Sequence, residues 1–144
     1  MRSVHESGYE VDDDRARLDL RLVHEWLSEE AYWSLGRSYE IVRESVAHSL
    51  AFGLYAPDGS QCGFARAVTD LATFTWLCDV FVEADHRGHG LGGFLVETAL
   101  SHPSVRRTRV VLATRPGRTL YRRLGFSPLA RPERWLERRD KESL

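Results

Sequence analysis

The sequence predicts an α+β domain in which helices pack against a mixed β-sheet. Three strand patterns follow one another through short turns over residues 50–82, which indicates an antiparallel meander. A strand, a helix and a further strand then follow over residues 73–113. Because such a right-handed crossover unit lays its two strands parallel, the sheet is expected to be antiparallel on one side and parallel on the other.

The N-terminal part is expected to form two helices. Leu18, Leu22 and Trp26 recur every four residues, which predicts an amphipathic helix that buries Trp26 in the core. The acidic run 12–14 precedes this helix. We interpret it as an N-cap with neighbours that complement the helix dipole, rather than as a metal site. A second helix is expected after Ser38.

Strands are expected where apolar and β-branched residues run between turn residues, at 50–56, 61–69, 73–82 and 109–113. A short helix over residues 118–124 follows, with Gly125 at its C′ position. In that geometry Tyr121 packs against Phe126. Two last edge strands are expected at 126–129 and 134–138.

Length and composition predict one domain that spans residues 1–144. The chain is 42% hydrophobic and 28% charged, which is typical of soluble globular proteins. Its apolar stretches are too short to cross a bilayer, and residues 1–14 lack the apolar run of a secretory signal. Cys62 and Cys78 are too few for a disulfide scaffold, so we expect a cytoplasmic protein with reduced thiols and no membrane partner.

The charge is unevenly distributed although the net charge is −1. Residues 101–144 carry 12 bases and 4 acids, whereas residues 1–100 carry 17 acids and 8 bases. The basic part suits an anionic ligand, and the acidic part suits, more weakly, a cationic substrate. The near-neutral total argues against a nucleic-acid partner.

A glycine-rich segment joins the strand 73–82 to a predicted helix that ends near Ser101. Its residues are Arg87, Gly88, His89, Gly90, Leu91 and Gly92. Glycines let a ligand approach the main chain, and free N–H groups at a helix start attract anions. The segment therefore predicts a phosphate- or pyrophosphate-binding loop. It is not a P-loop, because no Gly-Lys-Ser/Thr follows, and the three preceding strands distinguish it from a dinucleotide-binding unit.

Two motifs narrow this prediction. The first is the pattern Arg-x-x-Gly-x-Gly formed by Arg87, Gly90 and Gly92 after a strand, and the second is Leu-Tyr-Arg-Arg-Leu-Gly-Phe at residues 120–126. With their order and spacing, they resemble the GNAT superfamily, the GCN5-related N-acetyltransferases. The resemblance implies the GNAT fold, a mixed sheet of about six to seven strands with a splayed parallel pair, flanked by about four helices.

For the donor, the resemblance implies acetyl-CoA, or another acyl-CoA, as co-substrate and no metal. In this family the loop, here residues 87–92, binds the pyrophosphate through its N–H groups. The backbone of the preceding strand pairs with the pantetheine arm, which here involves Val80, Phe81 and Val82. Arg123 is expected near the CoA phosphates, or else complements the dipole at the end of its helix.

The resemblance assigns Tyr121 as the general acid that protonates the departing CoA thiolate. A phenol suits this task because its ordinary pKa of about 10 lies close to the thiol pKa of about 8.5. Packing against Phe126 is compatible with that role. Asp79 is the candidate general base, because strand alternation groups it with Leu77 and Phe81, and apolar neighbours raise a carboxyl pKa. A chain of water molecules in place of Asp79, and a purely structural aspartate, are the alternatives.

The acceptor site is expected near the loop between the first two helices, which covers the acceptor in this family. Tyr32 and Trp33 in that loop are candidate substrate-binding residues, as is Trp76 of the central strand. The predicted reaction transfers an acetyl group directly to a primary amine of a small molecule or a peptide. A non-catalytic module that senses acyl-CoA or serves a partner protein is the alternative. Homodimers are common in the family, and no stripe in this sequence marks an interface.

Overall fold

The computed structural model of the chain describes residues 1–115 and 117–140. The chain forms two compact units, Met1–Ala113 and Thr114–Leu144. The first unit holds the β-sheet and the helices α1 to α3, and the second holds α4.

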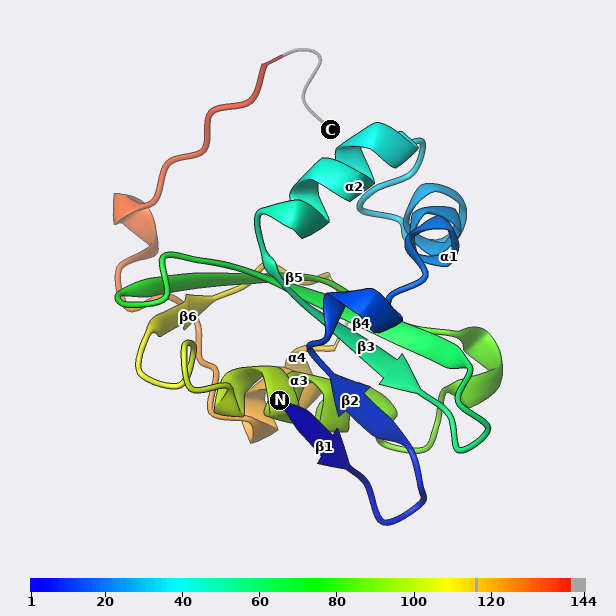
Figure 1. Cartoon of the computed structure of the whole chain (residues 1–144). Coiled ribbons are helices and arrows are strands. Elements are labelled where there is room, and N and C mark those ends of the chain that lie inside the picture. Colours follow the sequence, from blue (N-terminus) through cyan, green and yellow to red (C-terminus); the bar gives the residue numbers. More distant parts are fainter. Residues whose placement is uncertain (116, 141–144) are drawn as a thin grey trace. The chain divides into compact units, whose positions relative to one another are not determined.

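The first unit contains a six-stranded sheet whose strand order follows the order in the chain (Figure 1). The strands are β1 (Arg2–Val4), β2 (Glu10–Asp12), β3 (Leu50–Tyr55), β4 (Gln61–Thr69), β5 (Phe74–Val82) and β6 (Arg109–Val111). Strands β1 to β5 pair antiparallel with their neighbours, whereas β5 and β6 pair parallel. The prediction of a mixed sheet with a parallel pair is confirmed.

Helices cover both faces of this sheet. They are α1 (Leu20–Glu25), continued by a π-helical turn η2 (Trp26–Glu30), α2 (Tyr39–Ala47) and α3 (Leu91–Ser101). In Figure 1, α1 and α2 lie on one face and α3 lies on the other. The predicted second helix is confirmed, since Ser38 caps α2 by accepting a hydrogen bond of 3.2 Å from the Ile41 N–H.

The N-terminus differs from the prediction in two ways. Strands β1 and β2 form a hairpin that the sequence analysis did not predict, because three-residue strands carry too little alternation to register as a pattern. The expected helix is also divided. Asp14 caps a 3-10 turn, η1 (Arg15–Arg17), and it is Asp19 that caps α1 with a bond of 3.1 Å to the Leu22 N–H.

The acidic run 12–14 therefore performs three separate structural tasks. Asp12 pairs with Arg17 at 3.0 Å, Asp13 binds the N-terminal amine and His102, and Asp14 is the cap of η1. Among the described residues, no group of three His, Cys, Asp or Glu side chains is arranged to hold a metal ion.

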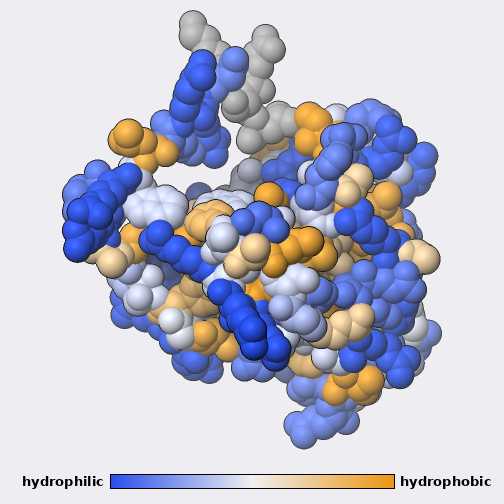
Figure 2. Space-filling view, turned by 60° about the vertical axis from the view of Figure 1, so that its left-hand side comes forward, coloured by the Kyte–Doolittle hydropathy of each residue, from blue (hydrophilic) through white to orange (hydrophobic). Residues whose placement is uncertain are grey.

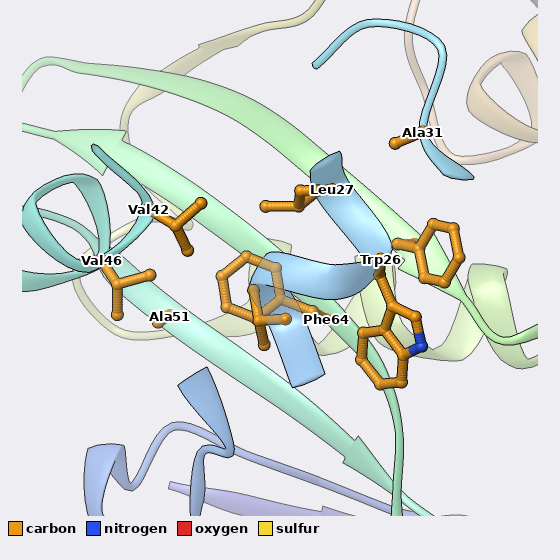
Figure 3. Packing of buried hydrophobic residues seen from close by; sticks show 9 residues of the cluster. Trp26, Leu27, Ala31, Val42, Val46, Ala51 and Phe64 are labelled. Carbon is orange, nitrogen blue, oxygen red and sulfur yellow. The ribbon is translucent and has the colours of Figure 1, made fainter. Parts of the chain in front are cut away.

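The core between the sheet and the first two helices is built around Trp26 (Figure 3). Its indole is 2% exposed and stacks on the Phe81 ring with centroids 5.3 Å apart, so its predicted core role is confirmed. Val42 and Val46 of α2 bury their side chains in the same cluster. This packing holds the helix-covered face of β5 in place.

The second unit contains α4 (Arg118–Arg123). The helix ends as predicted, because Gly125 adopts φ 94° and its N–H donates to the Arg122 carbonyl. The Phe126 N–H reaches back to the Tyr121 carbonyl at 3.0 Å, and the two rings meet edge to face at 5.7 Å. This is the Schellman arrangement expected from the sequence. The predicted strands 126–129 and 134–138 are wrong: Pro132–Arg134 forms a 3-10 turn, and the other described residues of these segments are not strands.

The surface drawn in Figure 2 is largely hydrophilic, with hydrophobic residues in small groups. Such scattered apolar side chains are ordinary on a folded domain. Every helix in the described part of the chain is too short or too polar to cross a bilayer.

Candidate functional site

The predicted glycine-rich loop lies between the end of β5 and the start of α3 in the first unit. Gly88 has φ 85° and Gly90, the N-cap of α3, has φ 74°, so both adopt the left-handed conformation that side chains disfavour. No side chain among the described residues caps α3. The first hydrogen bond of the helix runs from the Phe94 N–H to the Gly90 carbonyl. The N–H groups that precede Phe94 in this turn face outward from the helix end.

Gly92 differs from the other glycines of this loop. Its φ is not positive, whereas, as at Gly88 and Gly90, a Cβ atom built on it meets no described heavy atom within 4 Å. Neither backbone strain nor packing within the protein therefore requires glycine here. Glycine within a helix costs stability relative to alanine, by about 0.5–1 kcal/mol in the middle of the helix. Open space kept at such a cost beside free N–H groups is the arrangement that a bound anion needs.

Arg87 is turned back toward the strand that precedes it. Its Nε donates a hydrogen bond of 2.7 Å to the Val82 carbonyl, and its guanidinium carbon lies 5.3 Å from the Phe81 ring centroid. This residue therefore fixes the entry of the loop. His89 is exposed, whereas His86 exchanges a hydrogen bond of 2.8 Å with the Tyr9 hydroxyl.

Strand β5 separates from β6 partway along its length. The parallel pairing covers only Phe74 to Trp76, opposite Arg109 to Val111. Strand β5 continues to Val82, and within the described residues β6 offers no partner beyond Val111. The backbone of residues 77–82 thus has one edge without a paired strand, at the position expected for the pantetheine arm. Of the predicted residues there, Phe81 is buried in the core, while Val80 and Val82 are half-buried.

A bulge in β5 carries Asp79. Between the pairs Phe64–Phe81 and Arg66–Cys78, β5 has one more residue than β4, and Asp79 adopts φ 52°. Such bulges redirect a side chain and interrupt the ladder. The side chain of Asp79 therefore does not follow the regular alternation of sheet faces from which apolar neighbours were expected.

The carboxylate of Asp79 lies among cationic and polar groups. Its Oδ1 accepts a hydrogen bond of 2.9 Å from the Trp33 indole N–H. Its Oδ2 accepts hydrogen bonds of 3.0 Å from Arg37 and 2.9 Å from Arg66. The Asp79 side chain is 2% exposed, and those of Arg37 and Arg66 are 12% and 14% exposed. The expectation of apolar surroundings was wrong, because the bulge and the linker before α2 bring two guanidinium groups to this carboxylate.

Neither arginine was predicted from the sequence. Arg66 interrupts an apolar strand at a position where only a buried partner makes a charge tolerable, and this signal was available. Arg66 also donates a hydrogen bond of 3.1 Å to the Ser49 hydroxyl. Arg37 lies in the irregular segment between η2 and α2. Such a segment has no periodic pattern from which the orientation of a side chain could be predicted.

The three predicted acceptor-site aromatics are partly exposed. Tyr32 and Trp33 meet edge to face at 5.1 Å and are 40% and 38% exposed. Trp76 is 37% exposed and lies opposite Val68 in the sheet register, on the same face as Arg66. The structure thus joins Trp33 to Asp79 directly, and it sets Trp76 on the face of the sheet that carries this cluster.

Neither cysteine is poised as a nucleophile. Burial raises the pKa of the Cys62 thiol to about 11. Burial likewise raises the pKa of Cys78 to about 11, even though Arg66 and Arg37 oppose the shift. Both thiols are therefore protonated near neutral pH, and a thiol in that state is a poor nucleophile.

Comparison with known proteins identifies the family. The model of the GNAT acetyltransferase domain matches residues 48–128, which include β3 to β6 and the glycine-rich loop. The chain belongs to the GNAT acetyltransferase family. A GNAT-family protein of Xanthomonas campestris pv. campestris has a similar structure, with a TM-score of 0.89 and 36% identity over 96% of each chain.

Two other relatives add detail. A GNAT acetyltransferase of Brucella melitensis, crystallised with acetyl-CoA, shares the fold at a TM-score of 0.66 and 24% identity, over 85% of this chain and 84% of that one. A protein of Gibberella zeae with a provisional acetyltransferase assignment is 27% identical over a match that covers 62% of this chain. The match spans 60% of the length of that curated relative.

Two predicted residues of this GNAT acetyltransferase, Tyr121 and Arg123, lie in the second unit. The Tyr121 ring is half-buried and packs on Phe126, so the structural part of its expected role is present. Arg123 is exposed in the last turn of α4, where a cation complements the helix dipole.

Proposed function

We propose that this GNAT acetyltransferase transfers the acetyl group of acetyl-CoA directly to a primary amine. The observation that carries the proposal is the start of α3, where uncapped N–H groups adjoin the open space beside Gly92. A diphosphate bound there would satisfy these donors and interact favourably with the helix dipole. The Brucella relative crystallised with acetyl-CoA supports this choice of ligand.

The free edge of β5 supplies the second part of a donor site. The pantetheine arm of CoA contains two amides, and an extended amide chain binds well to the unpaired edge of a strand. Residues 77–82 provide such an edge within a few residues of the loop. The thioester would then lie along β5 near Val80, close to the bulge at Asp79.

The chemistry is a direct acyl transfer. The amine nitrogen attacks the thioester carbonyl, the carbon–sulfur bond breaks, and the CoA thiolate leaves with a proton while the nitrogen loses one. High thiol pKa values at Cys62 and Cys78 argue against an acyl-cysteine intermediate. Tyr121 is assigned as the acid that protonates the thiolate, and this assignment rests on the family motif at residues 120–126.

We assign removal of the amine proton to water rather than to Asp79. The Asp79 carboxylate already accepts three hydrogen bonds, two of them from guanidinium groups. Taking up the amine proton would require this carboxylate to give up its ion pairs with Arg37 and Arg66. Asp79 instead acts as a positioning residue that joins the linker before α2 to the bulge of β5.

The test measures binding and turnover separately. Calorimetric titration with acetyl-CoA should detect one site, and release of CoA thiol should accompany acetylation in a panel of primary amines. Tyr121→Phe should lower kcat roughly 10²- to 10⁴-fold with little change in acetyl-CoA affinity. Tyr39→Phe, in a ring that packs on His24 of the first unit, is the matched control and should change neither quantity.

Two results would contradict the proposal. Absence of acetyl-CoA binding would remove the donor site altogether. Tight binding without turnover of any amine would instead identify the chain as an acyl-CoA-binding module.

A further inference from the structure

Two nearly buried arginines share a single acidic partner. Arg37 and Arg66 both contact Oδ2 of Asp79, at 3.0 and 2.9 Å. Within the described part of the chain, Asp79 is the one carboxylate in ion-pair contact with either guanidinium. The cluster therefore has a net charge of +1 in a place that is about nine-tenths removed from water. A buried charge without a counter-charge is costly, so such a site gains much from an added anion.

The two guanidinium groups also retain donors. Each has five N–H bonds. Arg37 donates to Asp79 through Nη1, and Arg66 donates through Nε to Asp79 and through Nη1 to Ser49. The planar fork of a guanidinium matches the two oxygens of a carboxylate. Remaining donors on two adjacent forks offer a compact anion several charge-assisted hydrogen bonds.

The surroundings indicate where such an anion would belong. The Trp33 indole is bonded to the same Asp79, with Tyr32 against its edge, and both rings are partly exposed. On the sheet, Trp76 and Val68 extend the face that carries Arg66, and they too are partly exposed. The cationic cluster is bonded to Trp33, shares a sheet face with Trp76 and adjoins the strand proposed to hold the thioester, which suits the acceptor and not the donor.

We propose that the acceptor is a small amine that carries a carboxylate, such as an amino acid, and that this carboxylate binds Arg37 and Arg66. The proposal rests on the proposed function, whose acceptor side it specifies. A monoanion neutralises the cluster, whereas a phosphate dianion would leave an excess negative charge. The cationic acceptor suggested by the acidic residues 1–100 is disfavoured, because charges beyond about 8 Å are largely screened while the two arginines act in contact.

The test compares acceptors that differ only in the anion. Leucine and phenylalanine are each assayed beside the corresponding amide and decarboxylated amine, with acetyl-CoA as donor. In at least one series the free amino acid should have a kcat/KM roughly 10- to 100-fold above its two analogues, the range that a charge-assisted hydrogen bond supplies. Arg37→Gln should abolish this preference, and Arg37→Lys should restore part of it. Arg43→Gln is the matched control, because Arg43 is an exposed arginine of α2 paired with Glu40.

A second readout does not depend on turnover. The indole N–H resonance of Trp33, assigned with Trp33→Phe, should shift on titration with the amino acid and not with its amide. If no amine is acetylated, the proposed function fails while this titration still tests the anion site. Equal turnover of amino acids and amides, an unchanged preference in a folded Arg37→Gln variant, or an amide that shifts the resonance equally would overturn the inference.

Discussion

The indole N–H of Trp33 and the carboxylate of Asp79 are joined by a hydrogen bond of 2.9 Å across 46 residues of sequence. One residue lies in the linker that precedes α2 and the other lies in the bulge of β5. The bond therefore connects the proposed acceptor wall to the strand proposed to carry the thioester. A change on either side of it is expected to affect acceptor binding more than donor binding.

Trp33→Phe tests this connection. The variant keeps an aromatic ring and removes the donor, so the free energy of unfolding should fall by about 1 kcal/mol. The KM for the amine should rise while the affinity for acetyl-CoA stays within twofold. Denaturant unfolding, acceptor kinetics and calorimetry measure the three quantities. A loss confined to acetyl-CoA affinity would show that Trp33 belongs to the donor site.

Asp79→Asn separates a positioning role from catalysis by a base. An amide cannot neutralise Arg37 and Arg66, so the free energy of unfolding should fall by about 3 kcal/mol. If Asp79 only positions its neighbours, the folded variant should keep the shape of the kcat–pH profile. If Asp79 is the base, the acidic limb of that profile should vanish, together with most of the activity. Chemical unfolding and pH-dependent kinetics on the same preparation distinguish these cases.

A pair of glycine variants tests the donor loop. Gly92→Ala meets no described atom within 4 Å and has no positive φ to strain, so stability should stay equal or rise by up to about 1 kcal/mol. Its affinity for acetyl-CoA should nevertheless fall, roughly tenfold or more, because the methyl group would enter the anion's space. Gly90→Ala should instead lose about 1–2 kcal/mol of stability, since φ 74° is strained for alanine. Thermal unfolding and calorimetric titration of both variants make the comparison. Unchanged affinity in Gly92→Ala would argue against a ligand at this turn.

Because the phenol of Tyr55 is buried, we expect the stability of the fold to depend on pH in the alkaline range. Burial raises the pKa of its phenol to about 12 in the folded protein, although the nearby Arg17 guanidinium lowers it in part. Between pH 10 and 12 the unfolded chain releases this proton and the folded chain keeps it, so stability falls as pH rises, by about 2–3 kcal/mol in total. Tyr55→Phe should remove that portion of the decline. At pH 7 it should be neutral or slightly stabilising, because Tyr55 Oη is buried without a hydrogen-bond partner among the described residues. A steeper alkaline decline in the variant would contradict this account.

Much of the architecture was predictable because its signals are local. Gly125 required a left-handed residue at the end of α4, which placed Phe126 against Tyr121, and the structure has this arrangement. Ser38 is a favourable N-cap residue, and it marked the start of α2 in the sequence. The strand at residues 61–69 was predicted with the limits that the structure has. Caps, turns and strand alternation depend on neighbours in sequence, so a single chain reveals them.

The environment of Asp79 was not predictable in the same way. Its three donors come from Trp33 and Arg37 in the linker and from Arg66 on the adjacent strand. A one-residue bulge decides which way the carboxylate points, and such an irregularity leaves no periodic trace in the sequence. The glycine-rich loop was therefore recognisable from the sequence, whereas the surroundings of Asp79, proposed as the acceptor side, were not.

The strand order of the sheet has a consequence for folding. Every strand pairs with the next one in the chain, and the antiparallel pairs β1–β2, β3–β4 and β4–β5 are joined by short turns. The parallel pair β5–β6 can form only after a connection of 26 residues, which contains α3, has closed into a loop. Loop closure of that length makes this pairing a late step in assembly. The β2–β3 pairing closes a still longer connection of 37 residues, so these two seams, one of them proposed to bind acetyl-CoA, form after the hairpins. A ligand bound at the β5–β6 seam would stabilise the completed fold in proportion to the logarithm of its concentration, linking co-substrate supply to the lifetime of the folded chain.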